Sequence, residues 1–88
     1  FIMDIENLNK NIKTKLLKNS FIQNVKIEDK TYLHINHLSH EKNKFHIKLT
    51  IFSNQLRAIS KLEATKKINK ILEEEIKKHI HSIQILFE

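Results

Sequence analysis

The sequence predicts a small α+β domain in which helices cover one face of a three-stranded mixed sheet. Three segments alternate apolar and polar residues, as half-buried strands do, and two longer segments repeat apolar residues at helical spacing. Their order along the chain is α-β-β-α-β. The first two strands can pair antiparallel, whereas the helical connection to the third strand implies a parallel pair and a right-handed crossover. Because both helices have a single apolar stripe, both are expected on the same face of the sheet.

The first helix is predicted from Asp4 to Lys18, with Asp4 as its N-cap. Its apolar stripe consists of Ile5, Leu8, Ile12 and Leu16.

Two strands are predicted next, from Ile22 to Asp29 and from Phe45 to Phe52. In the second strand, alternate residues from Phe45 to Ile51 are apolar, and His46 falls on the opposite, polar face, where a surface position is expected. The polar connection from Lys30 to Lys44 is long for a hairpin, and connections of this length are often functional.

The second half of the chain is expected to contain a short linker, a long helix and the last strand. The linker, Ser53 to Ile59, has room for one helical turn, and Ser60 with Glu63 forms a capping box. The helix should run to about Lys78 and be buried through Leu62, Ile68, Ile71, Leu72 and Ile76. In the strand from His81 to Phe87, His81 shares the parity of the apolar residues, which by itself favours a partly buried structural histidine.

Composition excludes several classes of protein. The 88 residues include no Gly, Pro or Cys, so glycine-rich phosphate loops, disulfides, Cys-ligated zinc sites and Cys nucleophiles are absent. The length predicts one domain over residues 1–88, with residues 1–3 expected to be disordered or derived from an expression vector or cut precursor. No local nucleophile motif or deep pocket is expected, so we predict that the protein is not an enzyme. No apolar run is long enough for a membrane helix.

The net charge of +6 allows two interpretations. All basic residues except Arg57 are Lys, which suits diffuse attraction to nucleic acid or to an acidic partner. Alternatively, Lys, Ile and Asn dominate the sequence because their codons are rich in A and T.

Six histidines are the unusual chemical content of the chain. His34, His37 and His40 are spaced as two His-x-x-His pairs, and Asp29 or Glu41 could complete a zinc site. A solvated polar loop is the plainer interpretation of the same residues.

The region from Asn24 to Leu86 resembles the BolA family. Glu28–His34 is similar to an acidic stretch ending in Ser-x-x-His, with Thr31 in place of Ser. His46–Ser53 is similar to a strand that begins His-Phe-Lys-Val, and Ile80–Ile83 to a closing Val/Ile-His-Ala-Leu. The resemblance implies an αββααβ domain related to the class II KH fold.

The chain also departs from the family pattern. The family's Phe-x-Gly falls on Leu56–Ala58, its Arg-His-Arg on Ala64–Lys66, and a frequent Gly on Asn36. Because Ala58 cannot easily adopt positive φ, the backbone there is expected to be helical or rearranged.

The resemblance implies a non-enzymatic adaptor that binds a monothiol glutaredoxin and shares a bridging 2Fe–2S cluster with it and with glutathione, in iron–sulfur assembly, trafficking or iron regulation. The isolated protein would hold no cofactor. His81 matches the family's ligand histidine, which reverses the structural interpretation given above. The second ligand would be His34, with His37 or His40 as substitutes.

The alternative function is a KH-like nucleic-acid-binding module of the transcriptional-regulator type. Its surface would use Lys66, Lys67, Arg57 and Lys48, which could equally contact a protein partner. Without a Gly-x-x-Gly loop, such binding should be weak and salt-dependent. We expect a cytoplasmic protein, or an organellar one if a leader has been removed.

Overall fold

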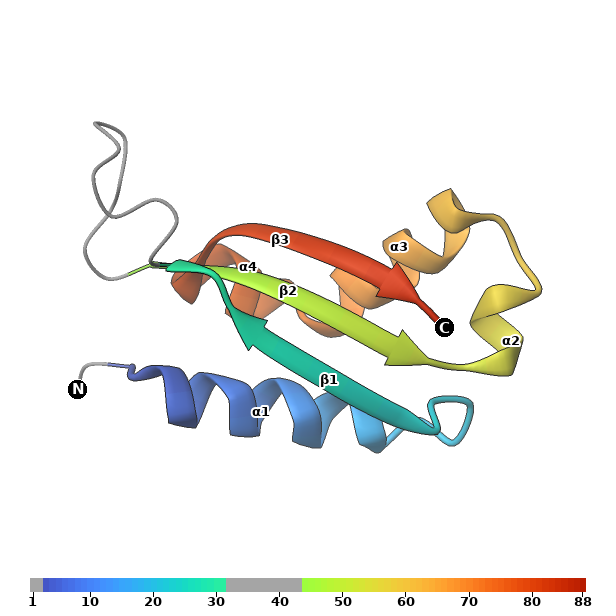
Figure 1. The fold of residues 1–88 in the computed structure, drawn as a ribbon, viewed down its shortest axis with the longest axis horizontal. Coiled ribbons are helices and arrows are strands. Elements are labelled where there is room, and N and C mark those ends of the chain that lie inside the picture. Colours follow the sequence, from blue (N-terminus) through green and yellow to red (C-terminus); the bar gives the residue numbers. More distant parts are fainter. Residues whose placement is uncertain (1–2, 32–43) are drawn as a thin grey trace.

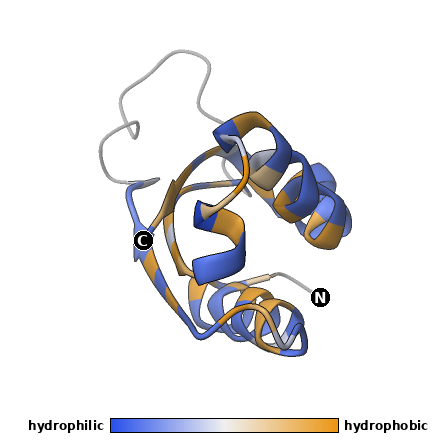
Figure 2. Cartoon of the chain, turned by 90° about the vertical axis from the view of Figure 1, so that its right-hand side faces the viewer, coloured by the Kyte–Doolittle hydropathy of each residue, from blue (hydrophilic) through white to orange (hydrophobic). Residues whose placement is uncertain are grey.

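The computed structural model describes residues 3–31 and 44–88, which form a three-stranded sheet with helices packed on one face (Figures 1 and 2). The predicted α+β class and the order of the main elements are confirmed. The elements are α1 (Ile5–Leu17), β1 (Asn24–Asp29), β2 (Phe45–Phe52), α2 (Asn54–Arg57), α3 (Lys61–Ile71), α4 (Glu73–His79) and β3 (Ile80–Phe87).

The central strand of the sheet is β2. It pairs antiparallel with β1, where Ile27 lies opposite Leu49, and parallel with β3, where Leu49 lies opposite Ile85. Both pairings agree with the predicted mixed sheet. Helices α2 to α4 connect β2 to β3, and β3 then runs parallel beside β2, as in a βαβ crossover.

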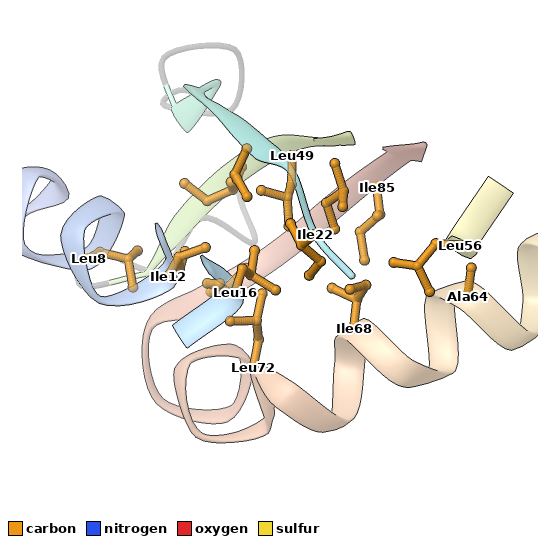
Figure 3. Packing of buried hydrophobic residues seen from close by; sticks show 14 residues of the cluster. Leu8, Ile12, Leu16, Ile22, Leu49, Leu56, Ala64, Ile68, Leu72 and Ile85 are labelled. Carbon is orange, nitrogen blue, oxygen red and sulfur yellow. The ribbon is translucent and has the colours of Figure 1, made fainter. Parts of the chain in front are cut away.

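The core lies between the sheet and the helices, as Figure 3 shows. Helix α1 contributes Leu8, Ile12 and Leu16, which have no exposed surface. These are three of the four residues of the predicted stripe, and the fourth, Ile5, is half-buried. Burial of each such Leu or Ile side chain contributes roughly 1.5–3 kcal/mol. The other hydrophobic residues with no exposed surface in the described chain are Leu49, Ile51, Ala64, Ile68 and Leu72.

The start of the described chain is anchored to this core. The carboxylate of Asp4 accepts a 2.8 Å hydrogen bond from the amide of Asn7, so the predicted N-cap is confirmed. Met3, one of the residues expected to be disordered, is half-buried and packs against the core. Phe1 and Ile2 lie outside the described residues.

The long helix predicted to run to Lys78 is divided into α3 and α4 at Leu72. Leu72 leaves helical geometry, with φ −99° and ψ 16°, although its side chain remains fully buried. The expectation that Leu62 is buried is wrong, because this side chain is 64% exposed. The buried positions are Ala64, Ile68 and Leu72, and a residue two places before Ala64 points about 200° away around the helix axis.

The linker contains the single helical turn that was expected, α2. Ser53 caps this turn by accepting a hydrogen bond from the amide of Leu56. Ala58 ends it with φ −81° and ψ −13°, so the expected helical backbone at this position is confirmed. Ser60 then caps α3 by accepting a 3.1 Å hydrogen bond from the amide of Glu63, as the capping box predicts.

A partly buried ion pair joins α1 to α4. The ammonium group of Lys15 lies 2.7 Å from Oε2 of Glu75, whose side chain is almost fully buried. The hydrogen bond to Glu75 raises the pKa of Lys15 above its usual value. On the exposed side of α4, Lys78 donates a 3.1 Å hydrogen bond to Glu74, which lowers the pKa of that carboxyl group. Within the described part of the chain, no helix is long and apolar enough to cross a membrane.

Candidate functional site

The candidate site lies where β3 begins beside β2. The parallel ladder contains a β-bulge here: Phe45 pairs with Ile80 and His46 with Ser82, so His81 is the additional residue. Bulges redirect side chains and are frequent beside functional sites. His81 is exposed, so the expectation of a partly buried histidine is wrong. The strand parity that suggested burial does not hold at the bulge.

His46 is buried, with 4% of its surface exposed, so its expected surface position is also wrong. Its Nδ1 atom forms a 2.7 Å hydrogen bond with Oγ of Ser82, and the direction of this bond depends on the tautomer of the ring. The His46 ring also packs against the His81 ring, with centroids 4.9 Å apart and planes tilted by 54°. Two imidazoles from sequence-distant strands are therefore in contact at the bulge.

The backbone of His46 is held by the residues that follow β1. Its amide donates a 3.2 Å hydrogen bond to the hydroxyl of Thr31, and its carbonyl oxygen accepts a 2.7 Å hydrogen bond from the amide of Lys30. The Thr31 hydroxyl in turn donates to the carboxylate of Asp29. Thr31 is thus the link that fixes the end of β1 beside the two histidines.

A hollow of about 320 Å³ lies on the open face of the sheet next to His46. Its lining includes His46 and Ser82 together with Lys30 and Lys48. Both ammonium groups lie near the Glu28 carboxylate, at 3.6 Å from Lys30 and 4.0 Å from Lys48. The positive charge at this hollow is therefore partly neutralised.

The other predicted site residues are dispersed. Lys66 and Lys67 are exposed on α3, on the helical side of the sheet, and Arg57 is exposed at the end of α2. Lys48 lies on β2, on the opposite face of the sheet from the helices, so these four residues do not form one surface. His34, His37 and His40 lie outside the described residues. Among the residues that are described, no group of three His, Asp or Glu side chains could hold a metal ion.

A family model for BolA-like proteins matches residues 17–87, which is most of the chain. The chain belongs to the BolA-like family. No curated protein matched the sequence.

Two solved structures have the same fold as this BolA-like chain. The BolA domain of SufE1 from Arabidopsis thaliana is 23% identical, with a TM-score of 0.77, and the match covers 98% of this chain and 93% of that one. BolA1 from Arabidopsis thaliana is 22% identical, with a TM-score of 0.76, and the match covers 97% and 94% of the two chains. At these identities the likeness establishes the fold.

In this BolA-like chain, the three stretches that carried the resemblance meet in the fold. Thr31, His46 and His81 belong to different stretches, and the Thr31 hydroxyl bonds the His46 amide while the two histidine rings are in contact. Sequence reasoning selected His81 as a candidate ligand, which stays a prediction, and it wrongly expected His46 at the surface. His46 opens the His46–Ser53 stretch that resembles the family motif, and this was the available sign that it belongs to the site. The alternation of apolar and polar residues, taken alone, assigned it to the surface.

Proposed function

We propose that this protein is a non-enzymatic BolA-type adaptor that binds a monothiol glutaredoxin and contributes His81 to a bridging 2Fe–2S cluster. The exposed imidazole of His81 at the β3 bulge is the observation that carries this proposal. The side chain lies at the end of the sheet, where it is accessible to a second protein. Membership of the BolA-like family supports the choice of partner.

The side-chain chemistry of the chain fits a shared cluster. The sequence contains no Cys, so thiolate ligands would have to come from the glutaredoxin and from glutathione. Imidazole is an established ligand of 2Fe–2S iron, as in Rieske centres. A bound cluster would supply an iron ion that an imidazole nitrogen of His81 can coordinate. The role of this chain is to present that nitrogen on a rigid strand.

The experiment is a titration with a monothiol glutaredoxin, iron, sulfide and glutathione, followed by visible absorption and circular dichroism. Wild-type protein should form a heterodimer with a new visible spectrum. His81→Ala should prevent this change, because the imidazole ligand is lost. The matched control is His79→Ala, which removes a histidine two residues away at the end of α4.

If His81→Ala gives the wild-type spectrum and affinity, His81 is not a ligand. If wild-type protein does not bind the glutaredoxin in the presence or absence of the cluster, the adaptor function is wrong.

The second ligand is proposed to be His34, or His37 or His40 in its place. Single alanine variants at the three positions should separate them, because only loss of the ligand will shift the visible spectrum of the heterodimer. The variants that keep the wild-type spectrum then serve as controls for the one that does not.

A further inference from the structure

We propose that His46 is a positioning residue that holds the His81 ring in one orientation, and that Ser82 anchors His46 for this task. The inference rests on the proposed ligand role of His81. Three observations support it: the burial of His46, its 2.7 Å hydrogen bond to Ser82, and its ring contact with His81.

His81 needs such a contact because of where it lies. His81 lies at the register shift between β2 and β3, as the additional residue of the ladder. An exposed histidine on a strand can occupy several side-chain rotamers. A neighbouring ring that is itself fixed limits those rotamers by packing.

His46 is fixed in the way this role requires. Its backbone bonds to Lys30 and Thr31 on one side, and its side chain bonds to Ser82 on the other. Ser82 follows His81 directly in β3, so the strand that carries the exposed imidazole also holds the ring that packs against it. The orientation of the His46 ring is therefore set by a hydrogen bond between β2 and β3, whose two residues are 36 positions apart in the sequence.

The consequence for ligation is preorganisation. If His81 populates one competent rotamer in place of three, the apparent affinity for its iron should rise about threefold, and second-shell effects on ligands commonly reach tenfold or more. Loss of His46 or Ser82 should thus speed dissociation of the cluster-bound heterodimer about 3- to 10-fold. The heterodimer without a cluster should dissociate at an unchanged rate.

The decisive measurement uses the isolated protein, so it does not depend on the glutaredoxin. Three-bond NMR couplings report the χ1 angle of His81. Wild-type protein should give the couplings of one rotamer, and His46→Ala and Ser82→Ala should both give averaged values. His46→Phe keeps an aromatic ring at the contact but loses the bond to Ser82, so it should restore the ordering only in part, which a general loss of structure would not explain.

The matched control is Gln84→Ala, an exposed position on the same face of β3 that does not bond His46. It should leave the His81 couplings unchanged. Should His46→Ala fail to fold, Ser82→Ala at its exposed position carries the test. Unchanged His81 couplings in Ser82→Ala and in any folded His46→Ala protein would overturn the inference.

The dissociation measurement separates this inference from the proposed function. Averaged couplings together with faster loss of the cluster-bound heterodimer support both. Averaged couplings with no heterodimer in the wild type support the geometric role of His46 and reject the adaptor function. Averaged couplings with unchanged dissociation show that the ordering does not serve ligation and reject the positioning role.

Discussion

Ser53 connects three parts of the fold through a single hydroxyl group. The hydroxyl donates a 2.6 Å hydrogen bond to the carbonyl oxygen of Phe21, just before β1, and accepts one from the amide of Leu56 in α2. The residue itself follows the last residue of β2 and is 1% exposed. Its removal would leave a partly buried carbonyl group and a buried amide without these partners, and unsatisfied buried groups are costly.

Ser53→Ala should therefore lower the free energy of unfolding by about 2–3 kcal/mol. The comparison is Ser60→Ala, which removes an exposed cap with one bond and should cost about 1 kcal/mol. Urea denaturation of both variants measures the difference. Equal losses would show that the bond to Phe21 adds little.

The two histidines show what periodicity can and cannot predict about a residue. The sequence motif was enough to select His81 as a ligand candidate, but alternation misjudged its exposure because the bulge interrupts the strand parity. His46 was misplaced for a related reason. Its burial depends on partners from β3, 36 residues away, and a single sequence gives no measure of that proximity.

At the level of elements, the pairing of α1 with α4 includes a charged contact. Lys15 is about one-third exposed, whereas Glu75 is almost fully buried. A carboxylate in this position is stabilised by the ammonium group beside it, and it would remain buried if that group were removed. The pair thus helps to fix how α1 lies against the second helical segment.

Lys15→Gln should reduce the free energy of unfolding by about 1 kcal/mol near neutral pH, since the exposed half of the pair is screened by solvent. The pKa of Lys15 is raised in the folded protein, so its contribution is complete below the unfolded pKa of 10.5 and is lost as pH rises through the folded value. The stability difference between wild type and variant should be constant from pH 7 to pH 9 and decrease above about pH 10.5.

Urea denaturation across this pH range measures that difference. Lys13→Gln, an exposed position on the same helix, is the control and should change stability little. A difference between wild type and Lys15→Gln that persists at the highest pH would contradict the role of the ion pair.

The order of the elements was predictable because each has a clear hydrophobic period. The division at Leu72 was not predictable, since no Pro or Gly marks it and apolar positions continue on both sides. Helix α4 buries Glu75 where an apolar residue would be expected, and only the position of Lys15 on α1 explains this. Tertiary contacts thus decided the features that local patterns missed.

For the whole molecule, the charge of +6 is spread over several faces. Lys67 and Lys70 line a hollow beside Phe21 on the helical side, and Lys48 lies on the open face of the sheet. Arg57 ends α2, which lies at the opposite end of the domain from the N-terminus (Figure 1). Dispersed lysines favour diffuse attraction to polyanions over recognition of particular bases.

Duplex DNA should accordingly bind with a dissociation constant of about 1–100 µM at physiological salt, and alike for unrelated sequences. The double variant Lys66→Ala/Lys67→Ala should weaken binding equally for two unrelated DNA sequences. It should also reduce the slope of the logarithm of the binding constant against the logarithm of the salt concentration by about one to two. Fluorescence anisotropy at several salt concentrations measures this.

Lys78→Ala, whose ammonium group is already bonded to Glu74, is the control and should have the smaller effect. A tight complex that discriminates between sequences at physiological salt would favour the nucleic-acid function over the adaptor.

The backbone geometry has a consequence for the unfolded chain. None of the described residues has positive φ, so each of these positions is open to a residue with a Cβ atom. An average chain of this length carries about six glycines, and this one has none. Replacing Gly by a residue with a Cβ atom at a compatible position raises the free energy of unfolding by about 0.4–1 kcal/mol, because it lowers the conformational entropy of the unfolded chain. Six such positions would together contribute about 2–6 kcal/mol. A small domain with a modest core thereby gains stability from a denatured state that has less conformational entropy to lose.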